Sequence, residues 1–340
     1  MASPELRTFP LGFPWQTAEP FLFCVHHHDR YPAGDEGMAP VGSLAGRQLG
    51  SDFSGKDGWS MYHGRSVPGF PRHPHRGFET VTIVRQGLID HSDSMGATAR
   101  FGAGDVQWIT TGRGLEHSEM FPLVNRDTPN PTELFQIWLN LPRRSKMDAP
   151  YFSMTWRDQL PVHHIGDAGA RTTVVTVAGA LEGHAAPAVP PSSWAADAES
   201  HLAIWTIRMD AGARWTVPAA DASAQRRLYF FAGDACTVAG QPLDRHVGIV
   251  APAEQALEIV ATGNEAVEFL MLQARPIGEP IAQHGPFVMN SQGEIRQAFE
   301  DFQAGRFGRW PWGDGAPVHA RERGRFAVFG DGRVEEPEAG

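Results

Sequence analysis

Two short pairs of residues have the type and the spacing of metal ligands. They are His73-x-His75 and His117-x-Glu119. Side chains at positions i and i+2 point to the same face of a β-strand, whereas on a helix they lie about 200° apart, and Pro74 argues against a helix at the first pair. If both segments are strands that line one cavity, three imidazoles and a carboxylate converge on one point. The pattern therefore predicts a metal site; the alternative is two ordinary histidine pairs on the surface or in the core.

The chemistry of these side chains narrows the choice of metal. Imidazole and carboxylate ligands without a thiolate suit iron, manganese, nickel, copper or zinc. Four protein ligands on an octahedral ion leave two adjacent positions for a substrate and dioxygen, whereas a structural zinc ion more often has a closed tetrahedral set that includes cysteine. We therefore expect one divalent ion, Fe(II) first, with Zn, Mn, Ni or Cu as alternatives.

A second acidic residue competes for the role of carboxylate ligand. Glu79 has the same parity as His73 and His75, so a regular strand through all three would place its side chain on the same face. Glu119 has the rival claim, because it lies two residues after the third histidine. The spacing leaves both interpretations open, with Glu119 favoured as the ligand and Glu79 as a residue that supports the ligands.

Three further residues are candidates for the surroundings of the metal. Gln107 could orient a ligand or a bound water molecule. Phe78 and Trp108 are candidate walls of a hydrophobic slot, although core packing is the alternative for Trp108. The run from His26 to His28 is less promising, because three consecutive residues of a strand cannot all face one point, and we expect a solvated loop there.

The segments that carry these residues have the composition of short strands. Runs rich in β-branched and aromatic residues alternate with glycine-containing turns. They cover residues 78–84, 106–110 and 134–139, and again 172–177, 202–207, 228–231 and 267–272. Strands of this length and spacing predict an all-β protein made of small antiparallel barrels or jelly rolls.

One helix is predicted near residues 291–304. Ser291 and Glu294 match a capping box, and Ile295, Ala298, Phe299 and Phe302 then repeat at i, i+3, i+4 and i+7.

The length of 340 residues predicts two domains. Residues 141–146 have the character of a linker, so we expect domains at 1–145 and 146–308, the second without a metal site, and a poorly ordered tail at 309–340.

The composition of the whole chain excludes several classes of protein. A net charge of −10 argues against direct binding of nucleic acid. No signal peptide and no run of 18 apolar residues is visible, which predicts a cytoplasmic protein without a membrane segment. With only two cysteines, Cys24 and Cys236, a disulfide framework and a cysteine-based zinc site are excluded.

Three longer motifs resemble the signature of the pirin family. They are His73-Pro74-His75-Arg76-Gly77-Phe78-Glu79-Thr80-Val81-Thr82, Gly104-Asp105-Val106-Gln107-Trp108-Ile109-Thr110 and Gly112-Arg113-Gly114-Leu115-Glu116-His117-Ser118-Glu119. The stretch Gly285-Pro286-Phe287-Val288-Met289-Asn290 resembles the pirin C-terminus. Pirins are two-domain members of the cupin superfamily. The resemblance therefore implies two cupin-type barrels in tandem with a short C-terminal helix, and an iron ion in the first barrel bound by His73, His75, His117 and Glu119.

The same resemblance implies two alternative functions. Some pirins cleave the flavonol quercetin at the 2,3-bond with dioxygen and release carbon monoxide, which would make Glu119 a catalytic residue as well as a ligand. Others are non-catalytic, redox-sensitive partners of a transcription factor or a metabolic enzyme, and fold alone does not choose between them. We expect the dioxygenase, acting on a small aromatic substrate and O2; a metal-dependent sugar isomerase is a weaker third hypothesis. Residues 26–68 and the tail after 308 depart from the pirin pattern.

Overall fold

The computed structural model describes residues 6–338 and divides the chain into two compact units, neither of which is continuous in sequence. One unit joins the residues up to Val25 to Asp158–Gly278. The other joins His26–Arg157 to the residues from Glu279 onward. This division differs from the predicted boundaries at 145 and 308, because each end of the chain pairs with strands far away in sequence, which composition cannot reveal.

The unit that contains residues 158–278 consists mainly of two antiparallel sheets. The larger sheet has, in spatial order, β1 (Arg7–Pro10), β20 (Val247–Pro252), β17 (Gln225–Ala232), β22 (Val267–Ala274), β15 (Ala203–Met209), β12 (Thr172–Ala178) and β11 (Val162–Ile165). The smaller sheet has β16 (Arg214–Val217), β21 (Leu257–Ala261), β18 (Cys236–Val238) and β19 (Gln241–Leu243), and a separate hairpin has β13 (Ala180–Leu181) and β14 (His184–Ala185). One apolar cluster, which includes Trp205, Leu228 and Ile259, forms the core of this unit.

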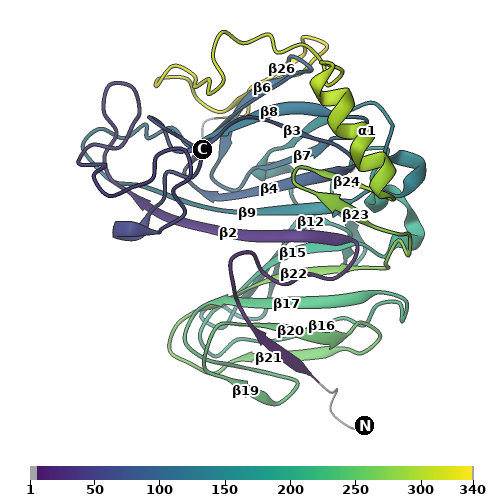
Figure 1. The fold of residues 1–340 in the computed structure, drawn as a ribbon. Coiled ribbons are helices and arrows are strands. Elements are labelled where there is room, and N and C mark those ends of the chain that lie inside the picture. Colours follow the sequence, from purple (N-terminus) through teal and green to yellow (C-terminus); the bar gives the residue numbers. More distant parts are fainter. Residues whose placement is uncertain (1–5, 339–340) are drawn as a thin grey trace. The chain divides into compact units, whose positions relative to one another are not determined.

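The unit that contains residues 26–157 also has two antiparallel sheets. The first has, in spatial order, β10 (Tyr151–Thr155), β7 (Val106–Thr110), β4 (Phe78–Gln86), β9 (Asn130–Asn140) and β2 (Phe21–Tyr31). The second has β26 (Val334–Glu335), β25 (Phe326–Val328), β6 (Thr98–Gly102), β5 (Leu88–Asp93), β8 (Leu115–Met120) and β3 (Gly69–His75). The strands expected at 78–84, 106–110 and 134–139 are confirmed. Figure 1 shows the two sheets of this unit stacked on one another.

Alternation along these strands separates the two faces of each sheet. Ile89, Phe101 and Ile109 belong to one buried apolar cluster inside this unit. The histidine-bearing strands β3 and β8 form the edge of the six-stranded sheet. The predicted metal ligands therefore lie on a sheet with a packed apolar interior beside them.

A hairpin and the predicted helix follow at residues 282–303. They are β23 (Ala282–His284), β24 (Phe287–Met289) and α1 (Gln292–Gln303), which lie side by side in Figure 1. The Ser291 side chain accepts a hydrogen bond from the Glu294 backbone N–H, as the capping box predicts. Ile295 and Ala298 are buried against Phe287 and the neighbouring aromatic rings, so the predicted helix and its apolar stripe are confirmed.

The remaining helices are single 3-10 turns. They are η1 (Lys56–Gly58), η2 (Arg143–Ser145), η3 (Arg157–Gln159), η4 (Trp194–Ala196) and η5 (Ala198–Ser200).

Residues 309–338, expected to be poorly ordered, are built into the histidine-bearing unit. Strand β25 pairs with β6, with Phe326 opposite Arg100. The buried Arg100 guanidinium pairs with Asp90 through two nitrogens and also donates to the backbone carbonyls of Ala320 and Arg323. The composition did not predict this contact, because the partners of the segment, strand β6 and the ion pair of Arg100 with Asp90, lie far earlier in the chain.

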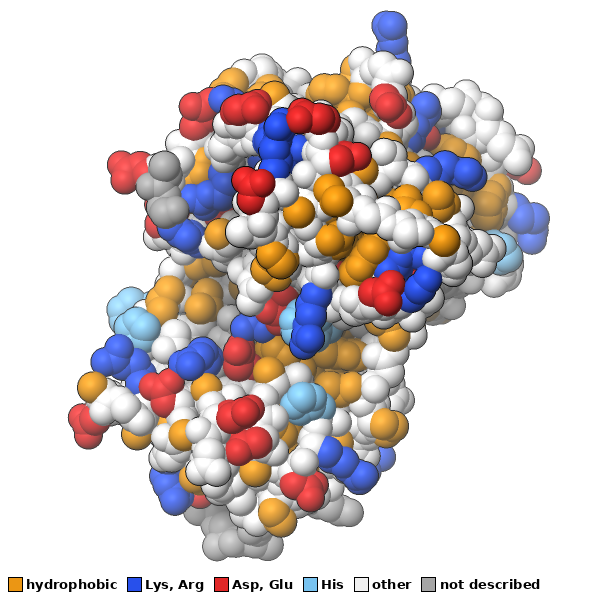
Figure 2. All heavy atoms as spheres, turned by 90° about the vertical axis from the view of Figure 1, so that its left-hand side faces the viewer, with side chains coloured by type: hydrophobic (Ala, Val, Ile, Leu, Met, Phe, Trp, Pro, Cys, Tyr) orange, Lys and Arg blue, Asp and Glu red, His pale blue; other side chains and the backbone are white. Residues whose placement is uncertain are grey.

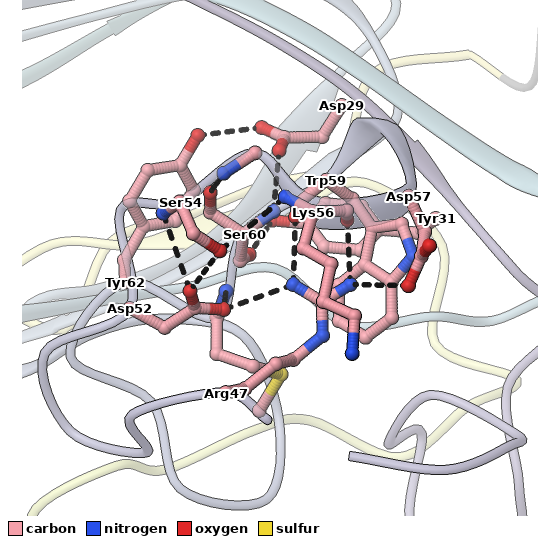
Figure 3. A network of polar contacts seen from close by, with 12 residues as sticks. Asp29, Tyr31, Arg47, Asp52, Ser54, Lys56, Asp57, Trp59, Ser60 and Tyr62 are labelled. Atoms are coloured by element: carbon pink, nitrogen blue, oxygen red, sulfur yellow. Dashed lines mark hydrogen bonds and ion pairs between the residues drawn. The ribbon is translucent and has the colours of Figure 1, made fainter. Parts of the chain in front are cut away.

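Residues 26–68 carry a polar network at the base of a long loop. The Asp29 carboxylate accepts hydrogen bonds from the Tyr62 hydroxyl at 2.7 Å and the Ser60 backbone N–H at 2.9 Å. Asp52 accepts a hydrogen bond from Arg47, as Figure 3 shows, and another from the Met61 backbone N–H. This network ties the loop to strand β2.

The predicted loop at His26–His28 is wrong, because all three histidines belong to β2. His27 is buried against aromatic rings and His28 is exposed. Consecutive residues of a strand point to opposite faces. Three histidines in a row therefore cannot share one metal ion, but they can belong to a strand.

Basic and acidic side chains are interspersed on the face drawn in Figure 2, without one large basic patch. Among residues 6–338, no helix is long and apolar enough to cross a membrane.

Candidate metal centre

Strands β3 and β8 bring three histidine rings together. The two strands are antiparallel neighbours with His73 directly opposite His117, and His75 lies on the same face as His73 because it is two residues further along. The ring centroids of His73 and His117 are 4.4 Å apart, and those of His75 and His117 are 4.9 Å apart. One nitrogen from each ring lies within 4.8 Å of the others, which is the arrangement of a three-histidine metal site.

Backbone carbonyls orient two of the three rings. His73 Nδ1 lies 2.8 Å from the Pro71 carbonyl oxygen, and His75 Nδ1 lies 3.4 Å from that of Pro286. A carbonyl can only accept, so in both rings Nδ1 is the N–H donor and Nε2 is the nitrogen with a free lone pair. Hydrogen bonds of this kind set the tautomer and direction of metal-binding histidines.

The third ring, His117, is buried and has no hydrogen-bond partner on either nitrogen. A buried polar atom without a partner costs about 1–3 kcal/mol, and a histidine with both nitrogens unpaired calls for a specific reason. A metal ion held jointly with His73 and His75 supplies that reason. The donor set therefore fits a divalent ion.

Burial keeps these rings neutral. It lowers the pKa of His73 to about 4, and it holds the pKa of His75 and His117 well below the ordinary value, with a smaller contribution from the neighbouring imidazoles. Neutral imidazole is the form that binds metal. The site therefore presents three available nitrogen donors around neutral pH.

Glu119 lies on the same face of β8 as His117, but its carboxylate is outside the cluster of three rings. Its Oε2 accepts a hydrogen bond from Gln136 Nε2 at 2.6 Å, and its Oε1 accepts one from the Thr82 hydroxyl at 3.3 Å. Burial raises the pKa of Glu119, and His91 and the two hydrogen bonds oppose that rise. The structure thus unites three of the four predicted ligands and places the fourth beside them.

Two of the predicted surrounding residues face the three rings. The Phe78 ring centroid lies 5.0 Å from that of His75. Gln107 is opposite Thr82, on the interior face of the sheet, and neither its amide nitrogen nor its amide oxygen has a partner. Both residues are fully buried.

The other two predicted residues point to the opposite face. Gly77, with φ of 86°, separates β3 from β4, so Glu79 belongs to a new strand and the parity argument fails. Glu79 accepts a hydrogen bond from Thr110, on the face opposite Phe78. Trp108 is the neighbour of Gln107 in β7 and faces away for the same reason.

Sequence reasoning missed three residues beside the site. His91 lies with its ring centroid 5.6 Å from that of His117, and Trp138 lies 5.4 Å from His75. Gln136 contacts Glu119. Gln136 and Trp138 alternate within the predicted strand 134–139, but only the pairing of β9 with β4 shows that this face meets the histidines.

The sequence matches two family descriptions: Pirin over residues 15–139, and the Pirin C-terminal cupin domain over residues 204–308. A Pseudomonas aeruginosa protein, provisionally named a quercetin 2,3-dioxygenase, is 37% identical over 247 residues, which are 70% of this chain and 79% of that protein. A pirin-like protein of Caulobacter vibrioides is 37% identical over 239 residues, covering 70% of this chain and 80% of its own length.

A solved structure agrees with these matches. The crystal structure of a quercetin 2,3-dioxygenase from Acinetobacter baumannii superposes with a TM-score of 0.66 at 26% sequence identity, covering 85% of this chain and 86% of that one. The predicted fold of two cupin domains with one helix is therefore confirmed.

Proposed function

Because this chain belongs to the pirin family, we propose that it is a metal-dependent dioxygenase that opens a flavonol such as quercetin with O2 and releases carbon monoxide. One observation carries the proposal: one ring nitrogen from each of three histidines, two buried and one half-buried, lies within 4.8 Å of the others, and one of these rings has no other partner. The names of the Pseudomonas aeruginosa relative and the Acinetobacter baumannii structure, both quercetin 2,3-dioxygenases by name, support the choice of substrate.

The proposed ligands are His73, His75, His117 and Glu119. Three nitrogen donors and one oxygen donor without sulfur suit Fe(II) first, and Zn, Mn, Ni or Cu as alternatives. When bound, the ion supplies a Lewis acid that lowers the pKa of a coordinated hydroxyl, and a redox-active metal supplies reactivity toward dioxygen.

Glu119 is the proposed base. Its buried carboxylate is held by Gln136, and burial raises its pKa, which makes it a better proton acceptor than an exposed glutamate. In this proposal Glu119 accepts the proton of the substrate hydroxyl that binds beside the three histidines.

Aromatic side chains supply a surface for a flat substrate. The ring centroids of Phe78 and Trp138 are 4.4 Å apart, and both rings contact His75 edge-on. Trp138 is half-buried, so its ring offers the aromatic surface, and the fully buried Phe78 packs against it. Trp138, and not the predicted Trp108, is therefore the proposed tryptophan wall of the substrate slot.

The test is oxygen uptake by the Fe(II)-loaded protein with quercetin, together with measurement of carbon monoxide and of bound iron. We expect uptake in the parent protein, its loss with the loss of iron in His75→Ala, and no change in His164→Ala, which removes an exposed histidine of the other unit. Absence of uptake with iron confirmed bound would refute the dioxygenase. The redox-sensitive binding protein would then be tested by comparing partner capture in the Fe(II) and Fe(III) states.

A further inference from the structure

Three polar side chains form a row across the interior face of the five-stranded sheet. Thr82 on β4 is paired in register with Gln107 on β7 and with Gln136 on β9. Residues that are directly opposite one another on neighbouring strands share a face of the sheet. The row therefore lies on the face that carries Phe78, toward the histidines of the six-stranded sheet.

Two members of the row reach across to the other sheet. Gln136 Nε2 donates to Glu119 Oε2 at 2.6 Å, and the Thr82 hydroxyl donates to Glu119 Oε1 at 3.3 Å. Both oxygens of the carboxylate are thus engaged, and the amide makes much the shorter contact. Hydrogen bonds to a charged group are roughly twice as strong as those between neutral groups.

The contact matters for the metal because of where Glu119 lies. It follows His117 by two residues on the same face of β8, yet its carboxylate is not in the cluster of three rings. Its position is set from the opposite sheet, by Gln136 and Thr82.

We propose that Gln136 is a positioning residue that fixes the Glu119 carboxylate relative to His73, His75 and His117, and thereby sets its contribution to metal affinity. This inference rests on the proposed function, in which Glu119 is a ligand. Without the amide, the carboxylate loses its short donor and can rotate about its side-chain bonds. Metal binding would then have to restrict the Glu119 carboxylate, which lowers the affinity. Loss of a group that orients a metal ligand typically weakens metal affinity about 10–100-fold.

The structure offers a matched control in the same row. Gln107 is the same residue type and neighbours Thr82 from the other side, but it is fully buried where Gln136 is half-buried, and it makes no hydrogen bond to Glu119. Replacement by methionine keeps the volume of glutamine and removes its hydrogen bonds. A general effect of losing a buried amide would therefore appear in Gln107→Met as well as in Gln136→Met.

The test is a titration with Co(II), followed by its visible absorption, whose intensity reports the number of ligands. We expect Gln136→Met to bind Co(II) about 10–100-fold more weakly than the parent protein with a changed spectrum, whereas any effect of Gln107→Met should be the same with and without Glu119. In Glu119→Gln, the further change Gln136→Met should have no additional effect, because a residue that acts through Glu119 is silent once Glu119 is gone. Circular dichroism and melting curves check that all variants are folded.

Each outcome decides the matter. Parent-like affinity and spectrum in Gln136→Met, or an equal loss of affinity with and without Glu119, would overturn the positioning role while leaving the proposed metal site intact. Unchanged binding in Glu119→Gln would overturn it by removing Glu119 from the ligand set. A parent protein that binds no Co(II) would refute the metal site itself, whereas bound metal without quercetin turnover would refute only the dioxygenase.

Discussion

The Asp29 carboxylate should make the stability of this protein rise on mild acidification, relative to a variant that cannot titrate there. Asp29 is buried, and burial is the largest of the effects that raise its pKa from 3.8 to about 6. The hydrogen bonds from Tyr62 and Ser60 and the charge of Arg47 act in the opposite direction, and Asp52 adds to the rise. The network is drawn in Figure 3.

The sign follows from proton uptake. A carboxyl group whose pKa is higher in the folded state holds its proton more tightly there, so the folded state gains stability as the pH falls from about 6 to about 4. Two pKa units correspond to about 3 kcal/mol at 1.36 kcal/mol per unit. That is the penalty the folded protein carries at neutral pH for keeping Asp29 ionised.

Asp29→Asn removes the titration and keeps the shape, and asparagine can still accept from the Ser60 N–H and donate to the Tyr62 hydroxyl. We expect the free energy of unfolding of the parent minus that of the variant to increase by about 2–3 kcal/mol between about pH 7 and about pH 4. All other titrating groups are common to both proteins and largely cancel.

The assay should report on this segment alone, because a chain of two units need not unfold in one step. Urea unfolding followed by hydrogen exchange of peptides from residues 26–68 meets that need. A difference that stays flat with pH, or that moves in favour of the variant on acidification, would refute the reasoning.

Three further variants test other contacts of the same unit. Arg100→Met leaves the buried Asp90 without its ion-pair partner, so we expect a loss of about 3–5 kcal/mol in urea unfolding; parent-like stability would contradict the ion pair. Gly77→Ala places a Cβ 2.0 Å from the Val288 carbonyl oxygen at a φ of 86°. We expect a lower melting temperature and weaker Co(II) binding, and an unchanged melt would show that the backbones separate easily. Lys146→Met removes the donor to three buried oxygens. Burial lowers the pKa of Lys146 to about 8, so the parent should gain stability between about pH 8 and about pH 10, and the variant should not; equal pH profiles in urea would refute this.

The three histidines of the site could be predicted from the sequence, because their shared orientation depends on the spacing of residues within a strand. His73 and His75 share a face of one strand through the two-residue period, and the third histidine was recognisable from the same pattern. Glu79 was misplaced because Gly77, in the left-handed region, separates β3 from β4, so the two-residue alternation of β3 does not continue to Glu79. Gln136 could not be assigned from spacing, since its role depends on which strand of the opposite sheet faces Glu119.

The organisation of the chain was harder to predict, for a related reason. The strand formed by Phe326–Val328 pairs with β6, and Ala327 and the neighbouring Phe329 are buried in the apolar cluster of this unit. The pairing partner lies far earlier in the chain, so the short apolar run alone could not identify it. The cytoplasmic location, the identity of the metal and a protein partner remain predictions from the sequence.

The interleaved connectivity has a consequence for biosynthesis. The histidine-bearing unit begins at His26 but needs residues 279–338, which follow the whole of the other unit in the chain. Those late residues supply the Pro286 carbonyl for His75, the Val288 carbonyl for Lys146, and the Asp301 carboxylate for Arg76.

Synthesis proceeds from the N-terminus, so a ribosome has translated the other unit completely before these partners of the metal site exist. The first β-rich half of this unit therefore stays incompletely packed until residues 279–338 have emerged, and we expect metal loading only after that point.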